Sequence, residues 1–90
     1  MSEVNEANEV NEETGVLELR APVDGVTEIT LREPTVDEIA TINEQTQKFG
    51  AVRAMKNIIA KMAKIEVATV GKMGARDFNA CNKYLSGFFD

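Results

Sequence analysis

Residues 16–38 read VLELRAPVDGVTEITLREPTVDE, and this stretch decides the fold. Apolar and polar residues alternate over 17–21 and again over 28–32, which is the period of a half-buried β-strand. The pair Asp24-Gly25 lies between the two runs and is typical of a hairpin turn. The stretch therefore predicts an antiparallel β-hairpin over residues 16–32.

The register of this hairpin depends on the length of its loop. A two-residue turn would put Leu17 opposite Arg32, which mixes apolar and polar side chains on one face. A three-residue loop over 23–25 would put Leu17 opposite Leu31, with Gly25 at the left-handed position that such loops require. We therefore expect the three-residue loop. Its apolar face needs a helix to cover it, because an isolated hairpin is only marginally stable.

The start of a helix follows the hairpin directly. Pro34 ends the second strand, and Thr35 with Glu38 three residues later forms a capping box, in which each side chain bonds the backbone of the other residue. Apolar spacing then predicts a helix over about 36–48, and Gly50 marks its end.

Two further helices are expected downstream. Over 51–65, apolar residues recur with helical period, and four cations occupy the opposite face: Arg53, Lys56, Lys61 and Lys64. Residues 66–74 read as a loop with room for one helical turn. The last helix is expected over about 75–86, with an aromatic end at Tyr84, Phe88 and Phe89.

Residues 1–14 differ in composition from the rest of the chain. They hold five acids and no bases, whereas residues 15–90 hold ten of each. A segment with so few apolar residues cannot bury enough surface to offset the entropy of its ordering. We therefore expect a disordered acidic tail over 1–14, followed by a single α+β domain over 15–90 with a hairpin and about three helices.

Composition argues against catalysis, a metal site or a cofactor. The 90 residues include no histidine, so the usual base near neutral pH is missing, and the single Cys81 falls on the apolar side of a predicted helix. No carboxylate or cysteine cluster has the spacing of a metal site. No stretch approaches the ~20 apolar residues of a membrane span, and the N-terminus lacks the features of a signal peptide. We expect a cytosolic, non-enzymatic protein.

Several apolar residues are candidates for contact with another protein. The stripe with Met55 and Met62 is either core or an adaptable groove. The aromatic end either packs under the hairpin or meets a partner or a second copy. The candidate partner-binding residues are Met55, Met62, Tyr84, Phe88 and Phe89. Self-association is also expected, because these apolar surfaces exceed what one small core covers.

The cationic face at 53–64 offers a different hypothesis, a nucleic-acid-binding regulator that uses Arg53, Lys56, Lys61 and Lys64. Its other interpretation is a solvated helix face. Interleaved aromatic residues are missing, and the acidic tail would compete with nucleic acid, so the sequence disfavours nucleic-acid binding.

The run Leu31-Arg32-Glu33-Pro34-Thr35-Val36, after a hairpin with Pro-x-Asp-Gly, resembles the signature of the tail assembly chaperones of Mu-like and P2-like contractile-tailed phages. Arg76-Asp77, ahead of an amphipathic helix that ends in Phe88-Phe89, is similar to that family as well. The resemblance covers roughly 17–89 and brings no catalytic residues.

The resemblance implies an assembly factor that binds the tape-measure protein, keeps it soluble and helps tail-tube subunits polymerise around it. Such a factor acts in the cytoplasm of the bacterial host and is absent from the finished virion. The remaining alternatives are the nucleic-acid-binding regulator and a structural tail subunit that stays in the particle.

Overall fold

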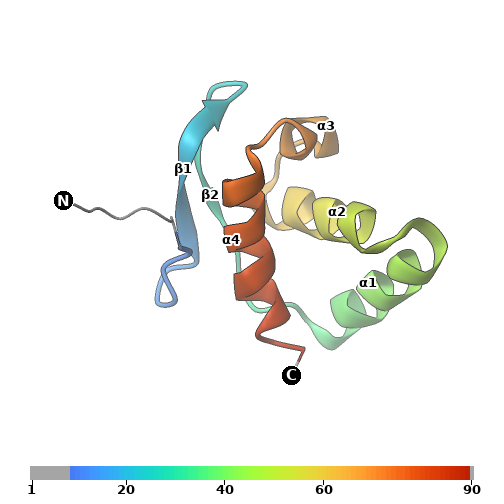
Figure 1. Cartoon of the computed structure of the whole chain (residues 1–90). Helices are drawn as coiled ribbons and strands as arrows, with labels where there is room; N and C mark the ends of the chain where they lie inside the picture. Colours follow the sequence, from blue (N-terminus) through green and yellow to red (C-terminus); the bar gives the residue numbers. More distant parts are fainter. Residues whose placement is uncertain (1–8, 90) are drawn as a thin grey trace.

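The computed structural model describes residues 9–89, in which a two-stranded hairpin precedes four helices (Figure 1). The strands are β1 (Val16–Val23) and β2 (Val26–Thr30). The helices are α1 (Val36–Phe49), α2 (Ala51–Ala63), α3 (Val67–Gly71) and α4 (Ala75–Ser86). The predicted α+β fold is confirmed, and α3 occupies the loop in which one helical turn was expected.

The hairpin and the helices enclose one apolar core. α4 packs against β1, α2 packs against β2, and α1 packs on α2 (Figure 1). Apolar side chains from both strands, from α2 and from α4 meet between these elements, among them Leu17, Ile29, Leu31, Ile59 and Leu85. α4 thereby has one face in the core and leaves the opposite face at the surface.

The hairpin turn is shorter than the loop expected from the sequence. Val23 pairs with Val26, so Asp24 and Gly25 form a two-residue turn in which both residues have positive φ, 52° and 82°. Turns of this kind match the twist of the flanking strands and favour Asp-Gly. The predicted three-residue loop is therefore wrong.

The predicted pairing of Leu17 with Leu31 is also wrong, because β1 contains an irregularity. Leu17 pairs with Ile29, and the five residue steps from Glu18 to Val23 face only two steps on β2. A bulge of this kind inserts extra residues into one strand, and Pro22 lies in it without an N–H to lose from the ladder. The bulge accommodates the difference in length, and Leu17, Leu19 and Ile29 remain buried, whereas Ala21 in the bulge is exposed.

A carboxylate of α4 completes the hydrogen bonding of this bulge. The two carboxylate oxygens of Asp77 accept the N–H of Arg20 at 3.1 and 3.0 Å, and one of them accepts the N–H of Ala21 at 3.4 Å. Asp77 is only 1% exposed. A buried carboxylate without donors is costly, so the N–H groups of the bulge satisfy Asp77, and this contact fastens α4 to the hairpin.

The chain joins the core before residue 15, where the sequence placed the start of the domain. Val10 is only 7% exposed and belongs to the core. The side-chain oxygen of Asn11 accepts the N–H groups of Glu13 and Thr14, at 2.8 and 3.1 Å. The predicted disorder is therefore wrong for residues 10–14, because the buried side chain of Val10 and the hydrogen bonds of Asn11 order this turn. Residues 1–8 lie outside the described residues.

The helix boundaries follow local signals. α1 and α2 are joined by the single residue Gly50, whose φ is 94°. α2 ends at Ala63 and not at the predicted 65, because Lys64 adopts a left-handed conformation with φ 61°. Among residues 9–89, no helix combines the length and the apolar character needed to cross a membrane.

Candidate partner-binding site

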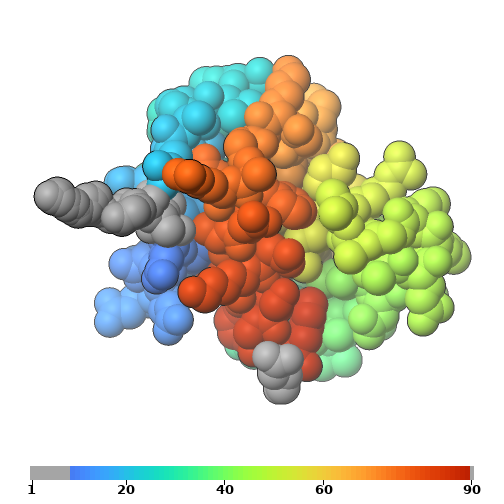
Figure 2. Space-filling view, in the orientation of Figure 1, coloured from blue at the N-terminus to red at the C-terminus, as the bar shows by residue number. Residues whose placement is uncertain are grey.

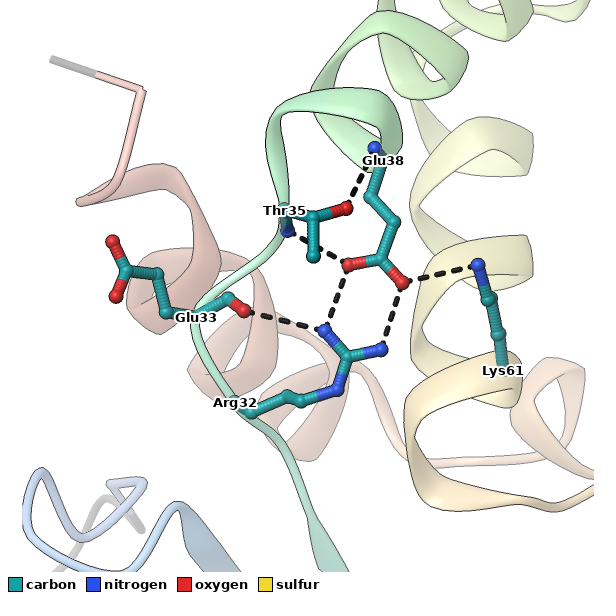
Figure 3. Close-up of polar contacts among 5 residues, drawn as sticks. All are labelled: Arg32, Glu33, Thr35, Glu38 and Lys61. Atoms are coloured by element: carbon teal, nitrogen blue, oxygen red, sulfur yellow. Dashed lines mark hydrogen bonds and ion pairs between the residues drawn. The ribbon is translucent and has the colours of Figure 1, made fainter.

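A buried carboxylate at the start of α1 is the first candidate for a functional group. Glu38 belongs to a polar group, called here the Glu38 cluster, that also contains Arg32, Thr35 and Lys61 (Figure 3). The guanidinium of Arg32 donates to both oxygens of Glu38, at 2.8 and 2.7 Å. The Lys61 ammonium lies 3.0 Å from one of these oxygens, and the Thr35 N–H donates to the other at 2.9 Å. The predicted capping box is confirmed, because the Thr35 hydroxyl also accepts the Glu38 N–H.

These contacts stabilise the charged form of Glu38. The Arg32 guanidinium, the Thr35 N–H and then the Lys61 ammonium hold the pKa of Glu38 well below its ordinary value of 4.5. A perturbed carboxyl can mark a functional site. Here each of its oxygens already has two partners from the same chain, so the cluster fastens the end of the hairpin, α1 and α2 to one another.

Contacts within the chain involve two of the four cations on the face predicted for α2, Lys61 and Arg53. Lys61 is paired with Glu38, and the Arg53 guanidinium lies over the Phe49 ring, 5.4 Å from its centroid. Lys56 is half-buried. The face thus does not offer four equivalent cations to a phosphate backbone, and the structure gives nucleic-acid binding no added support.

The candidate residues from the sequence fall into two groups. Met55 and Met62 are 7% and 8% exposed and belong to the core, the other interpretation of the methionine stripe. Tyr84 is half-buried, and its ring meets the Phe88 ring edge-on, with centroids 5.3 Å apart. Phe88 and Phe89 are 37% and 40% exposed. Of the five candidates, the aromatic three reach the surface together.

Beside these aromatic residues lies a groove of about 770 Å³, called here the α4 groove. One wall is formed by the outer face of α4 and by the turn that follows this helix. The other wall is formed by residues 9–12. Figure 2 shows this side of the molecule, with α4 exposed in orange to red and the N-terminal residues in blue beside it. The volume is within the roughly 300–1,000 Å³ that proteins use for ligand pockets.

The lining of the α4 groove is apolar in the middle and charged at its two sides. Its apolar lining residues are Val10, Ala80, Tyr84 and Phe88. The N-terminal wall carries two acidic residues, Glu9 and Glu12. The α4 wall carries two basic residues, Arg76 and Lys83. The ammonium of Lys83 lies 3.8 Å from a carboxylate oxygen of Glu9, with both side chains largely exposed.

Only the α4 wall of this groove could be predicted from the sequence. The helical spacing of Arg76, Ala80 and Lys83 is the signal in the sequence that indicates an outward stripe on α4. The opposite wall was assigned to a disordered tail, so nothing predicted a groove between the two.

Within residues 9–89, no group of three or more histidine, cysteine or acidic side chains could hold a metal ion. Cys81 is fully buried, and burial together with the charge of Asp77 raises its pKa to about 12. The thiol is therefore protonated at neutral pH and is a poor nucleophile.

Comparison with known proteins identifies the family. The model of a family described as phage tail assembly chaperone proteins, E, or 41 or 14, matches residues 9–90. No curated protein and no solved structure matches the chain. The matched range contains the hairpin, the Glu38 cluster and the α4 groove. The family description does not distinguish one type of phage from another, so the restriction to Mu-like and P2-like phages stays a prediction. With nearly its whole length matched, the chain belongs to the family of phage tail assembly chaperones.

Proposed function

We propose that this chaperone binds the tape-measure protein of its phage, keeps it soluble and assists the assembly of tail-tube subunits around it. The observation that supports this best is the exposed aromatic surface at the end of α4, formed by Phe88 and Phe89 next to Tyr84. Contiguous exposed apolar side chains on a small domain mark a site of interaction with another protein. An assembly chaperone needs such a surface, because its task is to cover apolar parts of a partner until they are packed.

Co-expression tests this proposal. The tape-measure protein is produced alone, with the wild-type chain, and with the variant Phe88→Ser/Phe89→Ser, and its soluble fraction is measured. We expect the wild-type chain to raise the soluble fraction and to co-purify, and the double variant to lose most of this effect. Equal precipitation of the tape-measure protein with and without the wild-type chain would refute the proposal.

A matched control is available at the other end of the molecule. Phe49 is 54% exposed at the junction of α1 and α2, so Phe49→Ser removes one exposed aromatic ring away from α4. We expect this variant to retain the solubilising effect. If Phe49→Ser loses the effect and the double variant keeps it, the function stands but the contact surface lies at the α1–α2 junction.

In this proposal the chaperone acts in the host cytoplasm during assembly and does not remain in the virion. Mass spectrometry of purified virions should find the tube subunits and lack this chain. A stoichiometric amount of the chain in virions would identify a structural tail subunit.

The proposal includes self-association in the absence of the partner. Val36, Phe49 and Val52 are 82%, 54% and 63% exposed, which leaves apolar surface beyond the aromatic end. Sedimentation equilibrium of the purified chain over a range of concentrations tests it; a constant monomer mass would contradict it.

A further inference from the structure

We infer that the α4 groove is the docking site for an amphipathic helix of the partner, which lies along α4 with acidic residues toward Arg76 and Lys83 and basic residues toward Glu9 and Glu12. This inference rests on the proposed function, since the tape-measure protein is the partner that supplies the helix. It adds the site on this chain and the kind of segment that the site accepts.

The outer face of α4 has the shape that a second helix needs. Arg76, Ala80 and Lys83 follow one another at intervals of four and three residues, so they form a stripe along the helix, and Phe88 lies just past its end. From Arg76 to Lys83 the stripe is about 10 Å long at 1.5 Å per residue. Ala80 is the small residue in the middle, and small side chains let the side chains of a second helix enter between larger neighbours.

The backbone around the groove favours a helix over an extended chain. An extended peptide gains affinity from main-chain hydrogen bonds to its site. The main chain of α4 is bonded within the helix, and on the other wall the Asn11 N–H already donates to the Val16 carbonyl at 2.9 Å. A helical segment satisfies its own main chain, so it needs only side-chain contacts from the groove.

The charges at the two sides of the groove define the flanks of the occupant. Cations line the α4 side and acids line the N-terminal side, so a helix with an apolar stripe between acidic and basic flanks is complementary to both. The ion pair of Glu9 and Lys83 spans the groove at 3.8 Å and is solvent-exposed. Exposed pairs contribute little, so the occupant displaces this one at small cost.

A second copy of the chain fits this site less well. On α4 the only acid is Asp77, which is buried against the hairpin, while Arg76 and Lys83 are exposed. The exposed face of α4 from another copy would therefore bring cations that suit Glu9 and Glu12 but no acid for Arg76 and Lys83. A partner helix with its own acids is the better complement.

Two pairs of matched variants of the full chain test the inference. Ala80→Arg fills the middle of the groove, and Ala40→Arg makes the same change on the exposed face of α1. Lys83→Glu reverses a charge at the groove in the last turn of α4, and Lys48→Glu does so in the last turn of α1. The probe is the tape-measure protein itself, followed by overlapping peptides of its sequence. Thermal melts of all four variants verify that each remains folded.

We expect Ala80→Arg to weaken binding of the tape-measure protein at least tenfold and Lys83→Glu about three- to tenfold, with both controls close to wild type. A bound peptide should gain helical circular dichroism, and added salt should weaken its binding. If the wild-type chain binds but Ala80→Arg and Lys83→Glu bind equally well, the groove is not the site and the proposed function stands. If the wild-type chain does not bind, the proposed function itself fails. Binding without a gain in helicity, or a groove variant that abolishes a dimer and leaves tape-measure binding unchanged, would overturn the partner helix as occupant.

Discussion

Among the glycines in the described part of the chain, Gly15 has the least room for a side chain. Its φ is +76°, and a Cβ at this position would overlap the carbonyl oxygen of Leu31. The two residues face each other closely because the Leu31 N–H donates to the Gly15 carbonyl at 2.7 Å. This glycine closes the open end of the hairpin, and its position could not be inferred from the sequence because the register of the strands was not yet known.

Gly15→Ala should lower the free energy of unfolding by at least about 2 kcal/mol, since the left-handed conformation and the overlap with Leu31 both oppose it. Gly25→Ala is the matched control, because Gly25 has a φ of +82° with open space around it. It should cost only about 1 kcal/mol. Urea unfolding measures both; equal losses would show that the contact with Leu31 is not as close as described.

Asp77→Ala should lower the free energy of unfolding by about 2–4 kcal/mol, because it leaves the N–H groups of Arg20 and Ala21 without their acceptor. Asp77→Asn keeps one acceptor oxygen and should cost less. Hydrogen exchange at Arg20 and Ala21 should speed up in both variants. Unchanged exchange in Asp77→Ala would mean that these amides have another acceptor.

At the scale of helices and strands, a structural feature could be predicted when the residues that determine it are close together in the sequence. The start of α1 was predicted because Thr35 and Glu38 are three residues apart and need nothing else to form their capping box. The register of the hairpin was not, because the bulge in β1 depends on Asp77, 57 residues after Arg20. The contact between Glu38 and Lys61 was not predicted for the same reason, since Lys61 lies on another helix.

Glu38→Gln should destabilise the junction of the hairpin, α1 and α2 by about 1–3 kcal/mol near neutral pH. The pKa of Glu38 is lowered by folding, so its contribution is complete above the ordinary value of 4.5 and is lost as the pH falls from there toward the folded-state pKa. Melting temperatures measured from pH 7 to pH 3 should converge between variant and wild type. A constant difference across that range would contradict the assignment of the low pKa to Glu38.

At the scale of the whole molecule, the surface was harder to predict than the core. Period and hydrophobicity indicated most of the buried residues, because a core needs only apolar side chains on the correct face. The α4 groove needs two segments more than sixty residues apart in sequence, 9–12 and 76–88, to lie side by side. Composition alone assigned the first of these to a disordered tail, because one buried side chain, Val10, is too small a signal in an acidic stretch.

Val10→Ala should lower the free energy of unfolding by about 1–3 kcal/mol, as a truncated core side chain does. In a domain of this size that corresponds to a fall in melting temperature of roughly 4–8 °C per kcal/mol. Glu12→Ala, at an exposed position in the same segment, should leave the melting temperature nearly unchanged. If the two variants melt alike, the N-terminal segment does not pack on the core.

The bond between Asp77 and the bulge also bears on how the chain is made. Synthesis proceeds from the N-terminus, so the hairpin emerges first, with the amides of Arg20 and Ala21 facing water and not their final acceptor. Contacts between residues this far apart in sequence form late and slowly. The hairpin therefore reaches its final form only after α4 has been translated, and a nascent or truncated chain that lacks α4 leaves the apolar side chains of β1 without their cover.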